Sequence, residues 1–257
     1  MQHVQSVDGT QIAYDRVGTG PALVLVVGAF NDRSSSNALA SRLSSSFTVY
    51  QYDRRGRGDS REAGPYSVER EVEDLAALIK AAGGSAFLFG HSSGGALALE
   101  AAAAGVPVRG VVVYEPPYTE GPTLKFAAQL AEMDAAGRKS EAVEAFLSLS
   151  GTPAAVLQQM KAGPYWAHME AFAHTLPYEV RLCNEGSIPS ERLAKIAAPV
   201  LALAGGASPA WAANGARAIA AAVQNGQDQV LEGQGHAVGD DVLVPILLEF
   251  AASAQRV

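Results

Sequence analysis

Residues 85–95 read Ser-Ala-Phe-Leu-Phe-Gly-His-Ser-Ser-Gly-Gly, an apolar run that passes directly into glycines, a histidine and two serines. The apolar residues 86–89 are typical of a buried strand, and the segment after the glycines predicts a helix over residues 96–104. Residues 90–94 fit the pattern Gly-x-Ser-x-Gly, in which a strand turns sharply into a helix and exposes a serine hydroxyl.

The spacing of the glycines identifies which serine stands at the tip of this turn. The residue at the tip takes a strained backbone conformation, and small residues two positions before and after it avoid collision. Ser92 has Gly90 and Gly94 at these positions, whereas Ser93 has His91 two positions before it. We therefore expect Ser92 to be the nucleophile. The backbone N–H of Ser93, at the start of the helix, is expected to face an oxyanion.

Similar apolar runs alternate with helical patterns along most of the chain. This alternation predicts an α/β fold, with a mostly parallel sheet and helices on both of its faces. Strands are expected at residues 3–7, 11–17, 22–28, 47–52, 86–89, 109–114, 199–204 and 228–231. Helices are expected at residues 34–43, 67–82, 96–104, 210–223 and 241–252.

Residues 116–198 interrupt the alternation, because they contain helical patterns without a convincing strand. We therefore expect a core domain of residues 1–116 and 191–257 and a helical cap, or lid, of residues 117–190 over the carboxyl ends of the strands. Helices of this cap are expected at residues 124–136, 140–149, 153–161 and 165–174. An apolar substrate pocket is expected to be lined by Phe30, Phe126, Phe146, Tyr165, Trp166, Phe172 and Tyr178.

The composition excludes several classes of protein. The 257 residues carry a formal net charge of −7 without a run of lysine and arginine, so we expect no nucleic acid partner. The only cysteine, Cys183, cannot form an internal disulfide or a cysteine-based zinc site. The N-terminus lacks the pattern of a signal peptide, and no apolar stretch is long enough to span a membrane. We expect a cytoplasmic protein that does not contact a membrane.

Three motifs, in this order, resemble those of the α/β-hydrolase superfamily. They are Asp53-Arg-Arg-Gly-Arg-Gly-Asp-Ser60, which resembles the D-x-R-G-x-G-x-S turn, the Gly-x-Ser-x-Gly motif of residues 90–94, and Gly233-Gln-Gly-His236. The resemblance covers nearly the whole chain. It implies the α/β-hydrolase fold, with an eight-stranded, mostly parallel sheet and a helical cap inserted after the sixth strand.

The resemblance also implies that His236 is the catalytic histidine. An imidazole suits this role, because it can take the proton of Ser92 and return it near neutral pH. The other histidines are not expected to be catalytic. His91 is expected to pack within the turn at residues 90–94, while His168 and His174 lie on presumed cap helices and His3 lies on the first strand.

In this superfamily the loop after the third strand supplies the second oxyanion donor. Gly28-Ala29-Phe30 occupies that position, and we expect the N–H of Ala29, with that of Phe30 as the alternative. The sequence departs from the family here, because Val27 stands where a histidine usually precedes the glycine.

A catalytic serine and histidine need a third group, a carboxylate that orients the histidine, and together they form a catalytic triad. This acid is the least regular feature of the sequence. In this superfamily the acid usually follows the seventh strand, but residues 204–211 contain no carboxylate. Glu115 ends the sixth strand, where some members place the acid, and we expect it to orient His236. Glu232 and Asp32 are the alternatives. Asp240 and Asp241 open the final helix, where capping accounts for them.

The sequence thus predicts a serine hydrolase that cleaves an ester, lactone or thioester of a small to medium, largely apolar molecule. The alternatives are C–C bond hydrolysis, perhydrolysis or lyase chemistry with the same triad, and a non-hydrolytic binding or cyclase-like protein that uses the cap cavity. We expect a small-molecule substrate and neither a metal nor a cofactor. The sequence leaves the oligomeric state open between monomer and homodimer.

Overall fold

The computed structural model describes residues 1–119, 121 and 123–254. Its internal contacts divide the chain into two compact units. We call Met1–Pro117 with Ile188–Val257 the sheet unit, and Tyr118–Ser187 the helical unit. The helical unit lies within the range 117–190 expected for the cap, and its role as a cap stays a prediction.

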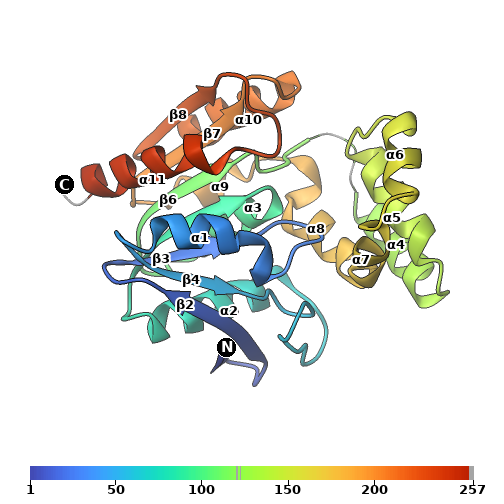
Figure 1. Ribbon diagram of the computed structural model, residues 1–257, viewed down its shortest axis with the longest axis horizontal. Coiled ribbons are helices and arrows are strands. Elements are labelled where there is room, and N and C mark those ends of the chain that lie inside the picture. The colour runs from blue at the N-terminus through green and yellow to red at the C-terminus, as the bar shows by residue number, and fades with distance from the viewer. Residues whose placement is uncertain (120, 122, 255–257) are drawn as a thin grey trace. The chain divides into compact units, whose positions relative to one another are not determined.

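The sheet unit contains an eight-stranded sheet, as the resemblance implies, in the order β1-β2-β4-β3-β5-β6-β7-β8 (Figure 1). The pairs β1–β2 and β2–β4 are antiparallel, and the remaining pairs are parallel. The strands are β1 (Gln2–Gln5), β2 (Gln11–Val17), β3 (Ala22–Val26), β4 (Thr48–Tyr52), β5 (Ala86–His91), β6 (Val108–Tyr114), β7 (Val200–Gly205) and β8 (Gly226–Leu231).

Helices cover both faces of this sheet. On one face α1 contacts α11, and on the other α3 contacts both α2 and α9, while α10 packs on β7 and β8 (Figure 1). The helices of the sheet unit are α1 (Asn37–Leu43), α2 (Val68–Ala81), α3 (Ser93–Ala103), α9 (Ser190–Leu193), α10 (Ala210–Ala222) and α11 (Asp240–Ala254). The short 3-10 helix η1 (Arg33–Ser36) precedes α1.

The central strands are apolar because they are covered on both faces. All five residues of β3 are buried, which explains the uninterrupted sequence Ala-Leu-Val-Leu-Val. Since β3, β5, β6 and β7 run parallel, their carboxyl ends meet at one edge of the sheet. The segments that follow these strands are therefore neighbours, although they are far apart in the sequence.

The helical unit contains the remaining helices of the described chain. These are α4 (Leu124–Ala135), α5 (Lys139–Leu149), α6 (Ala154–Lys161), α7 (Trp166–Ala171), η2 (Ala173–Thr175), α8 (Leu176–Leu182) and η3 (Asn184–Gly186). Within this unit, α4 contacts both α5 and α8, and α5 contacts both α6 and α7. No strand occurs among the described residues of this unit, as the sequence predicts.

Two predicted helices were wrong in their detail. The helix expected at residues 34–43 begins as η1, because the Asp32 side chain accepts a hydrogen bond from Ser34 N at 2.8 Å, and the α-helix starts only at Asn37. The helix expected at residues 165–174 ends at Ala171. A 3-10 turn separates it from α8, which has Pro177 in its first turn, the place where a helix tolerates proline.

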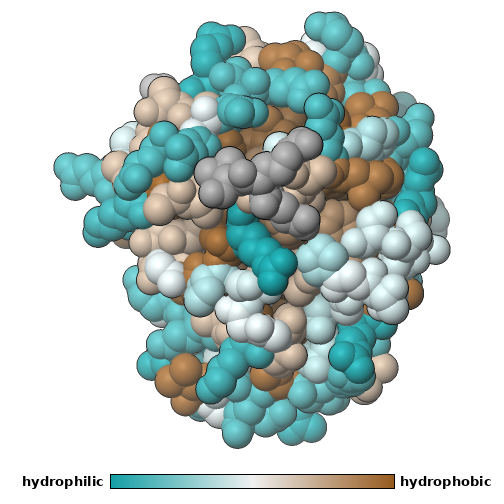
Figure 2. All heavy atoms as spheres, turned by 90° about the vertical axis from the view of Figure 1, so that its left-hand side faces the viewer, coloured by the Kyte–Doolittle hydropathy of each residue, from teal (hydrophilic) through white to brown (hydrophobic). Residues whose placement is uncertain are grey.

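A few large apolar side chains are exposed on the surface. Val7, Val17, Val230 and Leu248 are examples in the sheet unit. On the face shown in Figure 2, hydrophilic residues are interspersed with small hydrophobic areas. Such scattered exposure is usual for folded proteins. Within the described ranges, no helix is both long and apolar enough to cross a membrane.

Candidate active site

Ser92 occupies the turn between β5 and α3, as the sequence predicts. Its backbone has φ +55° and ψ −129°, a strained conformation for a residue with a side chain. A Cβ on Gly90 would come within 2.5 Å of Gly94 O, and a Cβ on Gly94 within 2.1 Å of Val26 O. Glycine is therefore required on both sides of Ser92, because the turn packs against its own helix and against β3.

The two serines of the turn have different surroundings. Ser92 is partly exposed, whereas Ser93 is only 2% exposed. The hydroxyl of Ser93 accepts a hydrogen bond from Arg54 Nη1 at 3.4 Å. This contact, together with burial, gives the side chain of Ser93 a structural role and leaves Ser92 as the accessible hydroxyl.

Glu115 and His236 lie together at the carboxyl ends of the strands. The Nδ1 atom of His236 is 2.6 Å from Glu115 Oε2, and Gly205 N donates to Glu115 Oε1 at 2.7 Å. Burial alone would raise the pKa of Glu115, but the hydrogen bonds with His236 and Gly205 hold this pKa below its usual value. An ionised Glu115 only accepts hydrogen bonds, so Nδ1 of His236 carries a proton and a neutral ring leaves Nε2 as an acceptor.

For the other candidate acids, all of which the structure describes, the surroundings do not include an observed contact with the imidazole of His236. Asp32 accepts hydrogen bonds from the backbone N–H and the hydroxyl of Ser34. Glu232 is exposed, and Asp240 and Asp241 lie in the first turn of α11. Glu115 is the carboxylate whose contact with the imidazole of His236 is observed.

His91 lies elsewhere than expected. Its Nε2 is 2.8 Å from the backbone oxygen of His236, so this nitrogen must carry the proton that is donated to the carbonyl. The two imidazole rings are 4.9 Å apart between centroids, and His91 also stacks on Tyr114 at 5.9 Å. Burial, reinforced by the neighbouring His236, lowers the pKa of His91 to about 4. His91 is therefore a neutral donor that holds the loop of His236.

Tyr114 holds the same loop from the next strand. Its hydroxyl donates to the backbone oxygen of Gly235. Burial, together with the charge of Glu115, raises the pKa of Tyr114 to about 12, so the phenol keeps the proton that it donates. The sequence did not single out Tyr114. The only signal was its position at the end of a strand, next to the expected acid.

The loop after β3 lies against the turn of Ser92. A Cβ on Gly28 would be 2.9 Å from the Cβ of Ser92, so glycine is required here for close approach. Ala29, the expected oxyanion donor, follows directly, and its carbonyl accepts a hydrogen bond from Asn31 Nδ2 at 2.7 Å. Phe30 is buried and has φ +60°. The loop therefore holds a second strained residue next to the turn of Ser92.

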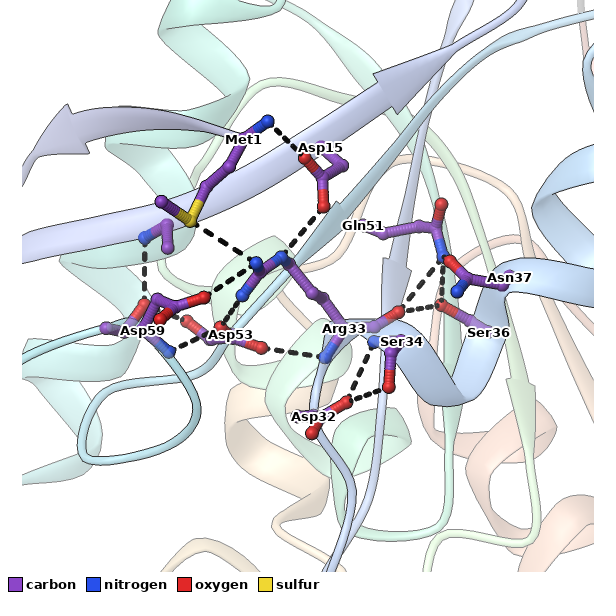
Figure 3. A network of polar contacts seen from close by, with 12 residues as sticks. Met1, Asp15, Asp32, Arg33, Ser34, Ser36, Asn37, Gln51, Asp53 and Asp59 are labelled. Carbon is purple, nitrogen blue, oxygen red and sulfur yellow. Dashed lines mark hydrogen bonds and ion pairs between the residues drawn. The ribbon is translucent and has the colours of Figure 1, made fainter.

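The far end of this loop is fixed by a network of polar contacts around Arg33 (Figure 3). The backbone N–H of Arg33 donates to Asp53 Oδ1 at 2.7 Å, and its guanidinium binds Asp53, Asp15 and Asp59. Asp53 is completely buried and also accepts a hydrogen bond from Asp59 N at 2.8 Å. The motif that begins at Asp53 therefore anchors the loop after β3.

The aromatic residues expected to line a pocket fall into two groups. Phe30 belongs to the sheet unit. In the helical unit, Tyr165 is 51% exposed and Trp166 is 6% exposed, and the indole N–H of Trp166 lies within hydrogen-bonding distance of Ser140 and Glu170. Phe172 is buried, and Phe126, Phe146 and Tyr178 are partly buried. Contact of any of these residues with a substrate stays a prediction.

A cavity of about 240 Å³ lies within the sheet unit, between the ends of β3 and β5 and the helices α1 and α11. Its lining includes Val27, His91 and Ala237, which are the neighbours of Gly28, Ser92 and His236. Asn31 and Asp240 add polar groups to this otherwise mostly apolar lining. Among the described residues, no group of three or more histidine, cysteine, aspartate or glutamate side chains could hold a metal ion.

The comparisons with known proteins agree with the fold described above. The model of the alpha/beta hydrolase family matches residues 23–243. The chain belongs to this family. An alpha/beta hydrolase from Sphaerobacter thermophilus DSM 20745 is 46% identical, with 97% of this chain and 99% of that chain covered and a TM-score of 0.91.

Two curated relatives match this chain over a shorter range. The uncharacterized hydrolase YraK of Bacillus subtilis is 36% identical over 98 residues, which are 37% of this chain and 36% of that protein. N-formylmaleamate deformylase of Pseudomonas putida is 37% identical over 118 residues, which are 44% of each chain. The chain therefore spans less than half the length of these two relatives.

Proposed function

We propose that this chain is a serine hydrolase that uses Ser92, His236 and Glu115 to cleave an ester, lactone or thioester of a small to medium, largely apolar molecule. The observation that carries the proposal is the 2.6 Å contact between His236 Nδ1 and Glu115. It fixes the tautomer in which Nε2 of a neutral imidazole is free to accept a proton. Ser92 stands on the neighbouring strand end as the accessible hydroxyl.

The reaction proceeds through an acyl-enzyme. Ser92 Oγ forms a bond to the substrate carbonyl carbon while its proton passes to His236 Nε2. The negative charge on the carbonyl oxygen is stabilised by the N–H groups of Ala29 and Ser93. The tetrahedral intermediate then breaks its bond to the leaving group, which receives the proton from His236.

Water completes the cycle. His236 takes a proton from the water as its oxygen bonds to the acyl carbon, and then returns a proton to Ser92 Oγ as the acid is released. Glu115 stays ionised throughout and stabilises the imidazolium at both stages. The hydrogen bonds that hold its pKa down favour this ionised state.

A C–N bond is a second candidate for the cleaved bond. Two of the curated relatives are N-formylmaleamate deformylase and 2-(acetamidomethylene)succinate hydrolase, at 37% and 36% identity over parts of their length. Both names denote hydrolases of compounds that carry an acyl group on nitrogen. The same triad can carry out this reaction, provided that His236 protonates the leaving nitrogen.

The test is a hydrolysis screen of acyl esters, lactones, thioesters and N-formyl or N-acetyl compounds, each with the Ser92→Ala variant as control. We expect turnover of at least one carbonyl class by the native chain and its loss in the variant. Turnover that survives in Ser92→Ala would contradict the triad. Binding of these compounds without any turnover by the native chain would favour a binding protein instead.

A further inference from the structure

The loop after β3 and the arginine-rich turn are joined by several hydrogen bonds and ion pairs. We call residues 27–33 the oxyanion loop and residues 53–60 the arginine turn. Arg54 Nη1 donates to Val27 O at 3.4 Å, and Arg57 Nη1 donates to Gly28 O at 3.2 Å. Two successive backbone carbonyls of the oxyanion loop therefore face guanidinium groups of the arginine turn.

The bond from Arg57 determines where the next N–H points. Gly28 O and the N–H of Ala29 belong to one planar, trans peptide group, so the two bonds point in opposite directions. Because Gly28 lies against Ser92, this peptide group is beside the nucleophile. With its oxygen held by Arg57, the peptide directs the N–H of Ala29 away from the arginine turn.

The contact is charge-assisted and shielded from water. Arg57 is 2% exposed and Arg54 is 1% exposed. A charged donor on a carbonyl oxygen also polarises the peptide, and this makes the N–H of the same peptide a stronger donor. Val27 stands where the family usually has a histidine before Gly28, and the carbonyl groups of Val27 and Gly28 accept hydrogen bonds from the arginine turn.

We propose that Arg57 is a positioning residue, which orients and polarises the N–H of Ala29 as an oxyanion donor. This inference rests on the proposed function. Arg54 supports the arrangement from the other side, because Nη1 also donates to the hydroxyl of Ser93, the second expected donor residue. Glu71 in turn binds the guanidinium of Arg54 through two hydrogen bonds of 2.6 Å.

Arg55 provides a matched control. It lies in the same turn and is 1% exposed, but its guanidinium binds Asp74 at 2.7 Å, Asp8 at 3.0 Å and the carbonyl of Arg70 at 3.1 Å. None of these partners belongs to the oxyanion loop. Loss of either arginine removes a buried cation, but only loss of Arg57 releases the Gly28 carbonyl.

The experiment compares Arg57→Met, Arg57→Lys and Arg55→Lys in kcat, KM and thermal unfolding midpoint. Removal of a whole oxyanion donor costs about 10²–10³ in kcat, and a misdirected donor is expected to cost less, about tenfold to a hundredfold. We expect Arg57→Met to lose this factor in kcat while KM changes less than about threefold. Arg57→Lys keeps a charged donor and should recover part of the loss.

A second measurement does not depend on activity. The amide proton of Ala29 in a ¹⁵N-labelled protein should shift upfield in Arg57→Met and Arg57→Lys, because the polarising bond is lost or weakened. Arg55→Lys should lower the unfolding midpoint and leave both kcat and this resonance unchanged. Labelling of Ser92 by a fluorophosphonate in the native chain tests the proposed function separately.

The inference is overturned if the Arg57 variants lose only stability, with native kcat and an unmoved Ala29 resonance. It is also overturned if Arg55→Lys and Arg57→Lys lower kcat equally. If Ser92 of the native chain is not labelled, the proposed function fails, and the Ala29 resonance still decides whether Arg57 orients this peptide.

Discussion

The sheet unit and the helical unit differ in where they hold strained backbone. In the sheet unit, the non-glycine residues with positive φ are Phe30, Ser92 and Glu115, among those that the structure describes. They follow three neighbouring strands, β3, β5 and β6. In the helical unit the two such residues, Asn184 and Glu185, are adjacent in a single turn.

The strained residues of the sheet unit belong to the expected active site, whereas those of the helical unit do not. Strain persists only where the surroundings enforce it, and strained residues cluster at functional sites. The three positions in the sheet unit coincide with the expected oxyanion loop, nucleophile and acid. We therefore expect substitutions at the ends of these strands to reduce turnover, and substitutions in the helical unit to change stability or substrate preference.

The largest effect is expected at Ser92. Ser92→Ala removes the proposed nucleophile and should lower kcat by on the order of 10⁶, as for other triad serines. This loss is measured as kcat of the purified variant and of the native chain on the best substrate of the screen. Ser93→Ala is the control, because its backbone N–H survives the substitution and only the contact with Arg54 is lost. Equal losses of kcat from both substitutions would show that Ser92 is wrongly assigned to the tip of the turn.

Glu115→Gln should have the second largest effect. The amide can donate to His236 Nδ1 and so favour the wrong tautomer, which costs roughly 10³ to 10⁴ in kcat in comparable triads. The variant is compared with Glu232→Gln and Asp32→Asn, with folding checked by circular dichroism. A folded Glu115→Gln enzyme with near-native kcat would remove Glu115 from the triad.

His91 should have a smaller effect on turnover. His91→Phe keeps a ring beside Tyr114 but removes the donor to His236 O, so the loop of His236 is held by fewer bonds. We expect kcat to fall about tenfold, because small displacements of a catalytic group cost up to about 10² in rate. His3→Phe, at an exposed position on β1, should leave kcat unchanged. A native kcat in His91→Phe would mean that Tyr114 alone suffices.

The same residue predicts a pH dependence of stability. The pKa of His91 is about 4 in the folded chain, whereas an unperturbed histidine has a pKa of 6.5, so the unfolded chain binds more protons between these values. The native chain should therefore lose stability as the pH falls from about 6.5 to about 4. The variant His91→Phe should lack this contribution in chemical denaturation at several pH values. Parallel pH profiles of the two proteins would contradict the assignment.

The smallest effect on turnover is expected in the helical unit. Trp166→Ala removes a buried ring and its hydrogen bonds to Ser140 and Glu170, and truncation of a buried tryptophan costs about 3–5 kcal/mol of stability. We expect a lower unfolding midpoint and a kcat for short substrates within about twofold of the native value. A changed chain-length preference at unchanged stability would instead assign Trp166 to the substrate pocket, as the sequence predicts.

Much of the sheet unit is readable from the sequence because its signals are local. The strand of residues 86–89 and the glycines around Ser92 lie within one short segment, and each constrains the backbone directly. The missing acid after the seventh strand is equally visible, and it directs attention to Glu115. The position of Glu115 next to Gly205 follows from parallel pairing of β6 with β7.

Contacts between distant segments could not be predicted in this way. The bond from Arg57 to Gly28 joins residues 29 positions apart, and the bond from His91 to His236 O joins residues 145 positions apart. Neither follows from periodicity or propensity, because both depend on how loops fold at the edge of the sheet. The end of α7 at Ala171 could not be predicted either, because the helical pattern continues through residues 165–174 without a local stop signal.

The most direct test of the account is the site of covalent labelling. The native chain is treated with a fluorophosphonate, digested and analysed by mass spectrometry over the peptide that contains residues 85–95. The account predicts one adduct on Ser92, its absence in Ser92→Ala and its retention in Ser93→Ala. An adduct on Ser93, or labelling that persists in Ser92→Ala, would contradict the assignment of Ser92 as the nucleophile.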